Sequence, residues 1–205
     1  MPLSSDPDDR VDARTLVTGA PLEIEIGPGP KAGFLLERVV SAPAAGLIGL
    51  EIRRKWAFVG DEKLAKVAPG RARVFCEDAR LALPRLGPNG TFARAFLHFP
   101  DPWWKKRHQK RLVMGDAFLT QIARLLVEGG ELYVQTDVEE RAELYERHVG
   151  EHPAFTPWGD AEGSPRMAEN PYGARSPREH RAIEDGLPVF RMRWRTRLGA
   201  ARSPA

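Results

Sequence analysis

The chain has 205 residues, 42% of them hydrophobic, which is enough for one well-buried core. Its net charge is only +3, so any attraction to nucleic acid has to come from local clusters of Lys and Arg. Cys76 is the only cysteine, which excludes an internal disulfide and a zinc site built from several cysteines and favours the cytoplasm. No apolar run approaches the roughly 20 residues of a membrane span.

The first twenty residues are polar, contain proline and show no periodicity. They are acidic where a signal peptide would be basic, and we expect a flexible leader. The predicted organisation is therefore a leader over residues 1–20, a single domain over residues 21–198 and a short tail over residues 199–205.

Beyond the leader, short apolar runs alternate with segments of helical periodicity. The predicted strands cover residues 22–26, 46–52, 73–76, 95–99 and 131–135, and the predicted helices cover residues 32–40, 53–67, 113–127 and a segment up to about 149. Alternation at this spacing is typical of an α/β protein with a doubly wound, mostly parallel sheet and helices on both faces.

The pattern changes after the last of these helices. Residues 159–181 are rich in Pro and Gly and lack a period, which indicates a binding loop or a disordered segment. Residues 189–198 alternate strictly and predict a half-buried terminal strand, with arginines at 191, 193, 195 and 197 on one face. The arginine face could contact phosphate, or its cations could protect an exposed sheet face or edge from aggregation.

Acidic side chains mark the ends of the predicted strands. They are Glu25, Glu51, Asp78, Asp101 and Asp137, one for each of the five strands in chain order. In an open α/β sheet, ligands bind at the carboxyl ends of the strands, so these carboxylates are candidate binding residues.

A glycine turn follows the first strand at Gly27 and Gly29. Glycines let a ligand approach the backbone, and an acidic residue ending the second strand, here Glu51, suits ribose hydroxyls. Position 31 is Lys where the dinucleotide pattern would have a glycine, so an NAD site is not expected. The acidic Glu25 just before the turn suits a cationic ligand, and S-adenosylmethionine carries both a sulfonium and an ammonium group.

The most informative segment is FPDPWWKKRHQKR, residues 99–111, directly after the fourth predicted strand. It combines one carboxylate, two tryptophans, five Lys or Arg and one His. Each part alone is ordinary, because charge runs are usually solvated loops. Together, at the carboxyl end of a buried strand, they indicate chemistry on a nucleotide.

These motifs together resemble the bacterial tRNA (guanine-N7)-methyltransferase family, Rossmann-like enzymes that use S-adenosylmethionine. The similarity runs from about Leu22 to Trp194 and is carried by LEIEIGPG, GLEI, CEDA, FPDPWWKKRHQKR and QTD. The long basic segment is highly specific, whereas the other motifs are shared by many methyltransferases.

The resemblance implies roles for individual residues. Cofactor contacts are expected at Glu25, Gly27, Gly29, Glu51, Asp78 and Asp101, with Asp101 also at the catalytic centre. Substrate contacts are expected at Lys105, Asp137, Ser176 and Glu179, and contacts to RNA at Arg107, His108, Gln109, Lys110 and Arg111. The implied substrate is a guanine in the variable loop of tRNA. Apart from the resemblance, we expect a monomer that needs no metal ion and binds no membrane.

Guanine N7 has a free lone pair, so methyl transfer needs alignment more than a general base. We expect Asp137 and Glu179, with Asp101 nearby, to accept hydrogen bonds from guanine N1–H and the exocyclic amine, although Asp137 or Thr136 could equally cap the following helix. His98 is interpreted as a packed or hydrogen-bonded core residue.

Three residues depart from the family pattern. Lys31 replaces a glycine, Leu112 replaces a basic residue, and Arg178 replaces an aromatic residue in the late motif Ser176–Glu179. Two alternatives stay open, a catalytically weakened RNA-binding relative and a methyltransferase of the same fold with a different substrate.

Overall fold

The computed structural model describes residues 1–4, 6, 8–100 and 114–197. The predicted tail therefore lies outside the described residues.

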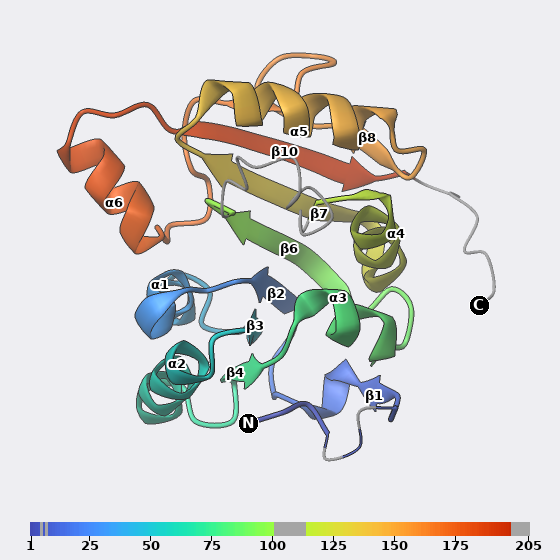
Figure 1. Cartoon of the computed structure of the whole chain (residues 1–205), viewed down its shortest axis with the longest axis vertical. Helices are drawn as coiled ribbons and strands as arrows, with labels where there is room; N and C mark the ends of the chain where they lie inside the picture. The colour runs from blue at the N-terminus through green and yellow to red at the C-terminus, as the bar shows by residue number, and fades with distance from the viewer. Residues whose placement is uncertain (5, 7, 101–113, 198–205) are drawn as a thin grey trace.

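A central sheet with the strand order β4-β3-β2-β6-β7-β10-β8, in which β9 also pairs with β10, organises the described chain (Figure 1). Its strands are β2 (Leu22–Ile26), β3 (Gly46–Glu51), β4 (Ala72–Cys76), β6 (Phe92–His98), β7 (Leu126–Thr136), β8 (Phe155–Pro157), β9 (Arg166–Met167) and β10 (Phe190–Thr196). The first five strands in space pair in parallel and β10 runs antiparallel to its neighbours, which confirms the predicted mostly parallel sheet.

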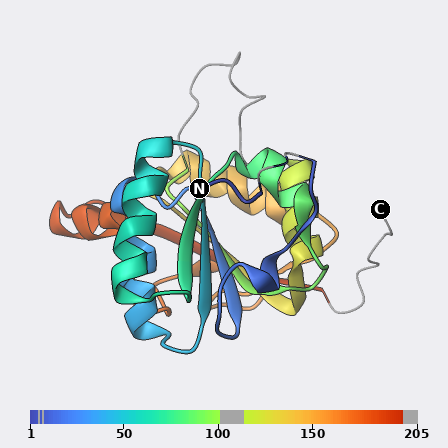
Figure 2. The same ribbon diagram turned by 90° about the horizontal axis from the view of Figure 1, so that it is seen from below.

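Helices cover both faces of the sheet (Figure 2). They are α1 (Gly33–Ser41), α2 (Arg54–Val67), α3 (Ala79–Ala82), α4 (Asp116–Leu125), α5 (Glu139–Glu151) and α6 (Pro177–Glu184), with short 3₁₀ turns at Ala13–Thr15, Pro30–Ala32 and Leu83–Arg85. Apolar residues of α1 and α2 form one core cluster with the sheet, and those of α3, α4 and α5 form another. Helical spacing of the apolar residues places them on the buried face of each helix.

The boundary between α4 and β7 differs from the prediction of a helix up to residue 127. The helix ends at Leu125, and Leu126 is already extended and pairs with Phe92. The pairing then resumes at Glu131 opposite Arg94, so the residues between form an irregular excursion. Gly129, at φ +70°, provides the left-handed turn that this excursion needs.

The region predicted as a loop over residues 159–181 contains β9 and the first five residues of α6. The terminal strand β10 lies inside the sheet between β7 and β8. Met192 and Trp194 are fully buried, as the alternation predicts.

The arginine side chains of β10 contact other side chains of the protein. Arg191 forms an ion pair with Glu179, and the guanidinium groups of Arg193 and Arg195 lie over the Trp158 ring. Arg195 and Arg197 are nevertheless exposed, so phosphate contact and protection from aggregation both stay predictions for the arginine face.

The predicted leader makes defined contacts with the domain. Within it, β1 (Val11–Asp12) pairs in parallel with β5 (Leu86–Gly87), and Leu3, Ala13 and Val17 are buried. The backbone N–H of Leu3 donates to Glu77 Oε1 at 2.8 Å. The structure thus differs from a wholly unstructured leader, because its few apolar side chains find places in the core.

Candidate active site

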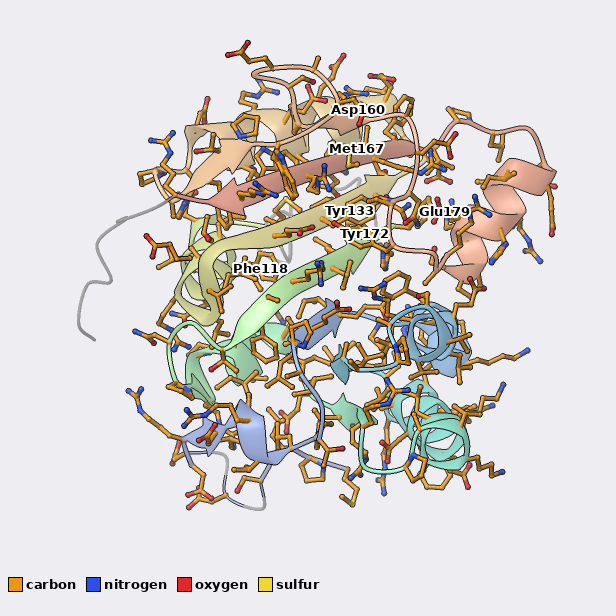
Figure 3. All side chains as sticks on the ribbon, turned by 180° about the vertical axis from the view of Figure 1, so that it is seen from behind. Phe118, Tyr133, Asp160, Met167, Tyr172 and Glu179 are labelled. Carbon is orange, nitrogen blue, oxygen red and sulfur yellow. The ribbon has the colours of Figure 1, made fainter. Side chains whose placement is uncertain are left out.

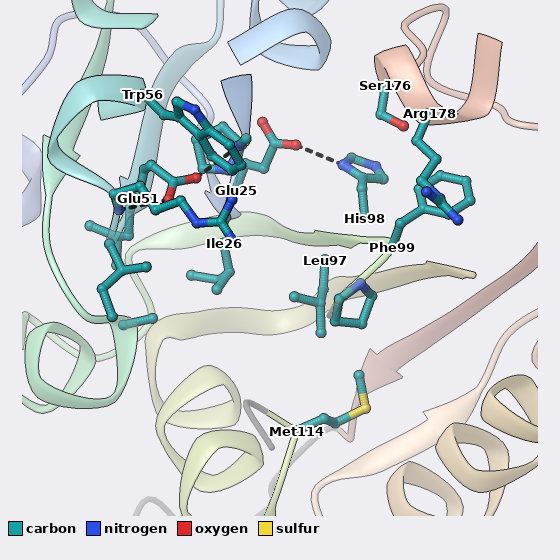
Figure 4. A pocket seen from close by; sticks show the side chains of 18 of the residues that line it. Glu25, Ile26, Glu51, Trp56, Leu97, His98, Phe99, Met114, Ser176 and Arg178 are labelled. Carbon is teal, nitrogen blue, oxygen red and sulfur yellow. Dashed lines mark hydrogen bonds and ion pairs between the residues drawn. The ribbon is translucent and has the colours of Figure 1, made fainter. Parts of the chain in front are cut away.

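A cavity of about 1120 Å³ opens where the parallel strands end (Figure 4). Its walls come from the ends of β2, β3, β6 and β7, from the segment after β4, and from the start of α6. Of the described residues with predicted roles, Glu25, Gly27, Gly29, Glu51, Asp78, Asp137 and Ser176 line it. The sheet therefore brings together side chains that are up to about 150 positions apart in the sequence.

The glycine turn after β2 is held against the end of β3 by Glu51. Its Oε2 accepts from the Gly29 N–H at 3.0 Å, and its Oε1 accepts from the Arg53 N–H at 2.8 Å. Both Gly27 and Gly29 have φ +69°, a conformation that suits glycine. Each carboxylate oxygen keeps a second lone pair, so Glu51 can also accept from two neighbouring hydroxyls.

Lys31 and Ala32 continue this turn with φ values of +74° and +50°. Both values fall in the left-handed region, which costs a residue with a Cβ about 1–2 kcal/mol. The glycine of the family pattern would avoid this strain at position 31. Lysine in place of the family's glycine at position 31 therefore adds backbone strain beside the cavity.

Glu25 and His98 form a buried pair in the cavity wall, with Glu25 Oε1 and His98 Nδ1 2.8 Å apart. The centroids of the His98 and Phe34 rings lie 4.3 Å apart, so His98 is both packed and hydrogen-bonded, as predicted. In the described part of the chain, Glu25 Oε2 has no hydrogen-bond partner. Burial raises the pKa of Glu25, opposed by the hydrogen bond and charge of His98.

Asp78 begins α3 and accepts from the Arg80 N–H at 3.0 Å. Its carboxylate also pairs with the Arg80 guanidinium, and these two contacts hold the pKa of Asp78 below its ordinary value. Asp78 thus stays ionised at the edge of the cavity, beside the Glu51 end of the site.

Asp137 lies at the end of β7 and forms an ion pair with Arg178 of α6. The Nη2 and Nε atoms of Arg178 donate to Asp137 Oδ2 at 2.6 and 3.1 Å. Asp137 does not cap α5, because Val138 occupies the N-cap position of that helix. The Val138 N–H donates to Thr136 Oγ1 at 3.3 Å.

Ser176 and Glu179 occupy the start of α6 but differ in their access to the cavity. Ser176 lines the cavity and caps the helix by accepting from the Glu179 N–H at 3.2 Å. Glu179 is fully buried and does not line the cavity. Its Oε1 accepts from Arg191 at 2.9 Å and its Oε2 from Asn170 at 2.9 Å, in the layer between α6 and the sheet (Figure 3).

The remaining predicted site residues, Asp101, Lys105, Arg107, His108, Gln109, Lys110 and Arg111, lie outside the described residues, as does Leu112. In the described ranges, no group of three or more His, Cys, Asp or Glu side chains is placed to hold a metal ion. No helix of these ranges is long and apolar enough to cross a membrane.

Comparison with known proteins identifies the family. A family model described as "Putative methyltransferase" matches residues 19–192. A tRNA (guanine-N(7)-)-methyltransferase of Anaeromyxobacter dehalogenans is 39% identical over 88% of this chain and 88% of its own length. The corresponding protein of Synechococcus sp. (strain JA-3-3Ab) is 31% identical over 84% of this chain and 71% of its own length. The chain belongs to the tRNA (guanine-N7)-methyltransferase family.

Solved structures agree with the family's fold. A Streptococcus mutans protein in complex with SAH superposes with a TM-score of 0.54 at 10% identity, covering 88% of this chain and 91% of that one. A SAM-dependent O-methyltransferase of Thermotoga maritima gives a TM-score of 0.54 at 15% identity, with 89% and 61% coverage. At these identities the likeness shows the fold alone, which is the Rossmann-like methyltransferase fold that the sequence predicts.

The methyltransferase cavity also contains residues that the sequence analysis did not single out. Trp56, in the first turn of α2, lines the Glu51 side and carries the Arg53 guanidinium 4.0 Å from its ring centroid. Tyr145 of α5 also lines the cavity, and burial raises its pKa to about 12. Trp56 follows Glu51 by five positions, a spacing that places it one helical turn beyond the strand end, so this aromatic could have been found.

Proposed function

We infer that this methyltransferase transfers a methyl group from S-adenosylmethionine to N7 of a guanine in tRNA. The observation that carries the inference is the match to tRNA (guanine-N(7)-)-methyltransferases at up to 39% identity across most of the chain. The cavity at the strand ends, with its glycine turn and carboxylates, is the site where this chemistry fits.

The described residues suit S-adenosylmethionine, which supplies an electrophilic methyl group on a sulfonium. A Cβ built on Gly27 would meet nothing within 4 Å, so the turn leaves open space beside the backbone. Glu51, at the end of β3, would accept from the ribose hydroxyls with the lone pairs that its bonds to Gly29 and Arg53 leave available. Glu25 adds a buried carboxylate without a full set of partners, which suits the positive end of the cofactor.

The protein's own contribution to the reaction is positioning and charge. Guanine N7 attacks with a lone pair and loses no proton, so no general base is required. Methylation leaves a positive charge on the purine, which the carboxylate of Asp137 at the cavity mouth stabilises. The family resemblance adds Asp101 to this centre as a proposal.

The basic segment at residues 99–111 is the proposed tRNA contact, because its five Lys or Arg residues concentrate positive charge in a chain with a net charge of only +3. We also propose that the enzyme works as a monomer in the cytoplasm, since a single cysteine suits a reducing compartment. Lys105 and the residues Arg107–Arg111 retain their proposed substrate and RNA roles.

Incubation of the protein with unmodified tRNA and labelled S-adenosylmethionine, followed by mapping of the modified base, tests the function. We expect one N7-methylated guanine. Label in a different molecule class would favour the alternative substrate, and thermal stability unchanged by S-adenosylhomocysteine would favour the non-catalytic RNA-binding alternative.

A Glu51→Ala variant tests the proposed cofactor site. It leaves ribose hydroxyls unpaired and should weaken S-adenosylmethionine binding by about 1–3 kcal/mol. Calorimetry measures this change directly. A dissociation constant equal to that of the parent would remove Glu51 from the proposed site.

A further inference from the structure

The guanine of the proposed substrate needs a recognition group that the buried Glu179 does not offer. Both carboxylate oxygens of Glu179 are engaged, one by Arg191 and the other by Asn170. It belongs to α6, and its side chain is fully buried. Releasing it would leave the guanidinium of Arg191 buried without its carboxylate, which is costly.

The mouth of the same cavity contains a different pair of polar groups, Asp137 and Arg178. Their ion pair uses only Oδ2 of the carboxylate and only Nε and Nη2 of the guanidinium. Asp137 Oδ1 and Arg178 Nη1 take no part in this ion pair. The Arg178 side chain is 63% exposed, so a ligand can reach it.

This arrangement sets a hydrogen-bond acceptor beside a donor. Guanine presents the complementary pair on one edge, with the O6 acceptor next to the N1–H donor. Adenine presents the reverse, because its position 6 carries a donor and its N1 is an acceptor. With N7 held toward the methyl donor the base has one orientation, and in that orientation Asp137 Oδ1 and Arg178 Nη1 match the edge of guanine and not that of adenine.

Phe99 adds an aromatic surface at the same place. The Arg178 Cζ atom lies 5.8 Å from the centroid of the Phe99 ring, and both residues line the cavity (Figure 4). Phe99 has φ +46°, a strained conformation for a bulky residue, and such strain concentrates at functional sites. A base held at this mouth can stack on the ring while its edge faces the ion pair.

We propose that Arg178 is a specificity-determining residue, which donates from Nη1 to guanine O6 beside the N1–H contact already expected of Asp137. The proposal rests on the proposed function and deepens it by naming how the base is recognised. It also gives a role to the arginine that stands where the resembled motif has an aromatic residue.

The test compares tRNAs that differ only in the base at the mapped position. Guanine has O6 and N1–H, hypoxanthine keeps both, and 2-aminopurine lacks both. For Arg178→Leu we expect kcat/KM on the guanine and hypoxanthine tRNAs to fall about 10- to 100-fold, because a charged hydrogen bond is lost. On the 2-aminopurine tRNA the same substitution should change kcat/KM less than about 2-fold.

An Arg175→Leu variant removes one exposed positive charge from the same segment outside the cavity, and should keep the parent's ratio of rates on the three tRNAs. Binding of S-adenosylhomocysteine by calorimetry should be equal in the parent and in both variants. If Arg178→Leu slowed all three tRNAs equally, or if Arg178→Phe kept the parent's selectivity, the assigned role would be wrong while guanine methylation by the parent still held. A parent that methylated no guanine would overturn the proposed function itself, and the inference with it.

Discussion

At the scale of the residue, Lys31 is a position where the family's glycine would fit better. At its φ of +74°, a residue with a Cβ destabilises the folded state by about 1–2 kcal/mol. Glycine removes this strain but loses more chain entropy on folding, which offsets part of the gain. We expect Lys31→Gly to raise the free energy of unfolding by about 0.5–1 kcal/mol. Urea denaturation measures this, and Lys31→Ala, which keeps the Cβ, should give no such gain.

Glu25 should make the stability of the ligand-free protein depend on pH. Because burial raises its pKa above the ordinary value near 4.5, its contribution to folding is fully present below that value. The contribution is lost as the pH rises through the raised pKa, by roughly 1.4 kcal/mol for each unit of the shift.

Glu25→Gln removes this titration and keeps an oxygen that can accept from His98. We expect the variant to match the parent at low pH, to be more stable than the parent at neutral pH, and to bind S-adenosylmethionine more weakly. Thermal denaturation across pH 4–8 follows the first two effects. Parallel stability curves for parent and variant would contradict the argument.

At the scale of the element, the Glu179–Arg191 ion pair fixes α6 to β10. Glu179→Ala leaves the guanidinium of Arg191 buried and unpaired, which should lower the free energy of unfolding by about 3–5 kcal/mol. Glu184→Ala, at an exposed position on the same helix, should leave stability nearly unchanged. A Glu179→Ala protein that was as stable as the parent but inactive would indicate instead that Glu179 contacts the substrate.

Element boundaries followed from sequence wherever local signals agreed. Residues 22–26 form β2 as predicted, because a segment of alternating apolar and acidic residues ends at a glycine turn. Residues 126 and 127 suit either a helix or a strand, and only the pairing of Leu126 with Phe92 decides between them. The start of α6 carried a readable signal, Ser at the N-cap followed by Pro, within a stretch that otherwise lacks a period.

In the candidate site too, local sequence signals predicted some residues, and long-range contacts decided the others. The carboxylates at strand ends were predictable because parallel strands share one edge, and Glu25, Glu51, Asp78 and Asp137 all line the cavity. The burial of Glu179 could not be predicted, because it depends on Arg191, which lies twelve positions later on β10. The pairing of Arg178 with a strand end 41 positions earlier could not be read from spacing either.

At the scale of the whole molecule, tRNA binding should depend strongly on salt. Each phosphate paired with a cation releases condensed counterions, with a slope of about 0.7 to 0.9 per contact. Replacing Lys110 and Arg111 together by Ala should weaken binding and flatten the slope by roughly 1.4 to 1.8 units.

Fluorescence titration of tRNA at several salt concentrations measures this slope, and calorimetry with S-adenosylhomocysteine serves as the control for an intact cofactor site. A double variant with the parent's affinity and slope would show that these two cations do not contact phosphate. The case for tRNA would then depend on the family alone.

The interior position of β10 has a consequence for synthesis on the ribosome. Strands β4, β3, β2, β6 and β7 are complete once residue 136 has emerged, yet the outer edge of β7 has no partner until residues 190–196 follow. During that interval the nascent sheet presents an open edge, and the space filled by Trp194 and Met192 is vacant. The growing chain therefore passes through a stage at which chaperone capture of β7 and premature pairing with a neighbouring polypeptide compete with native closure.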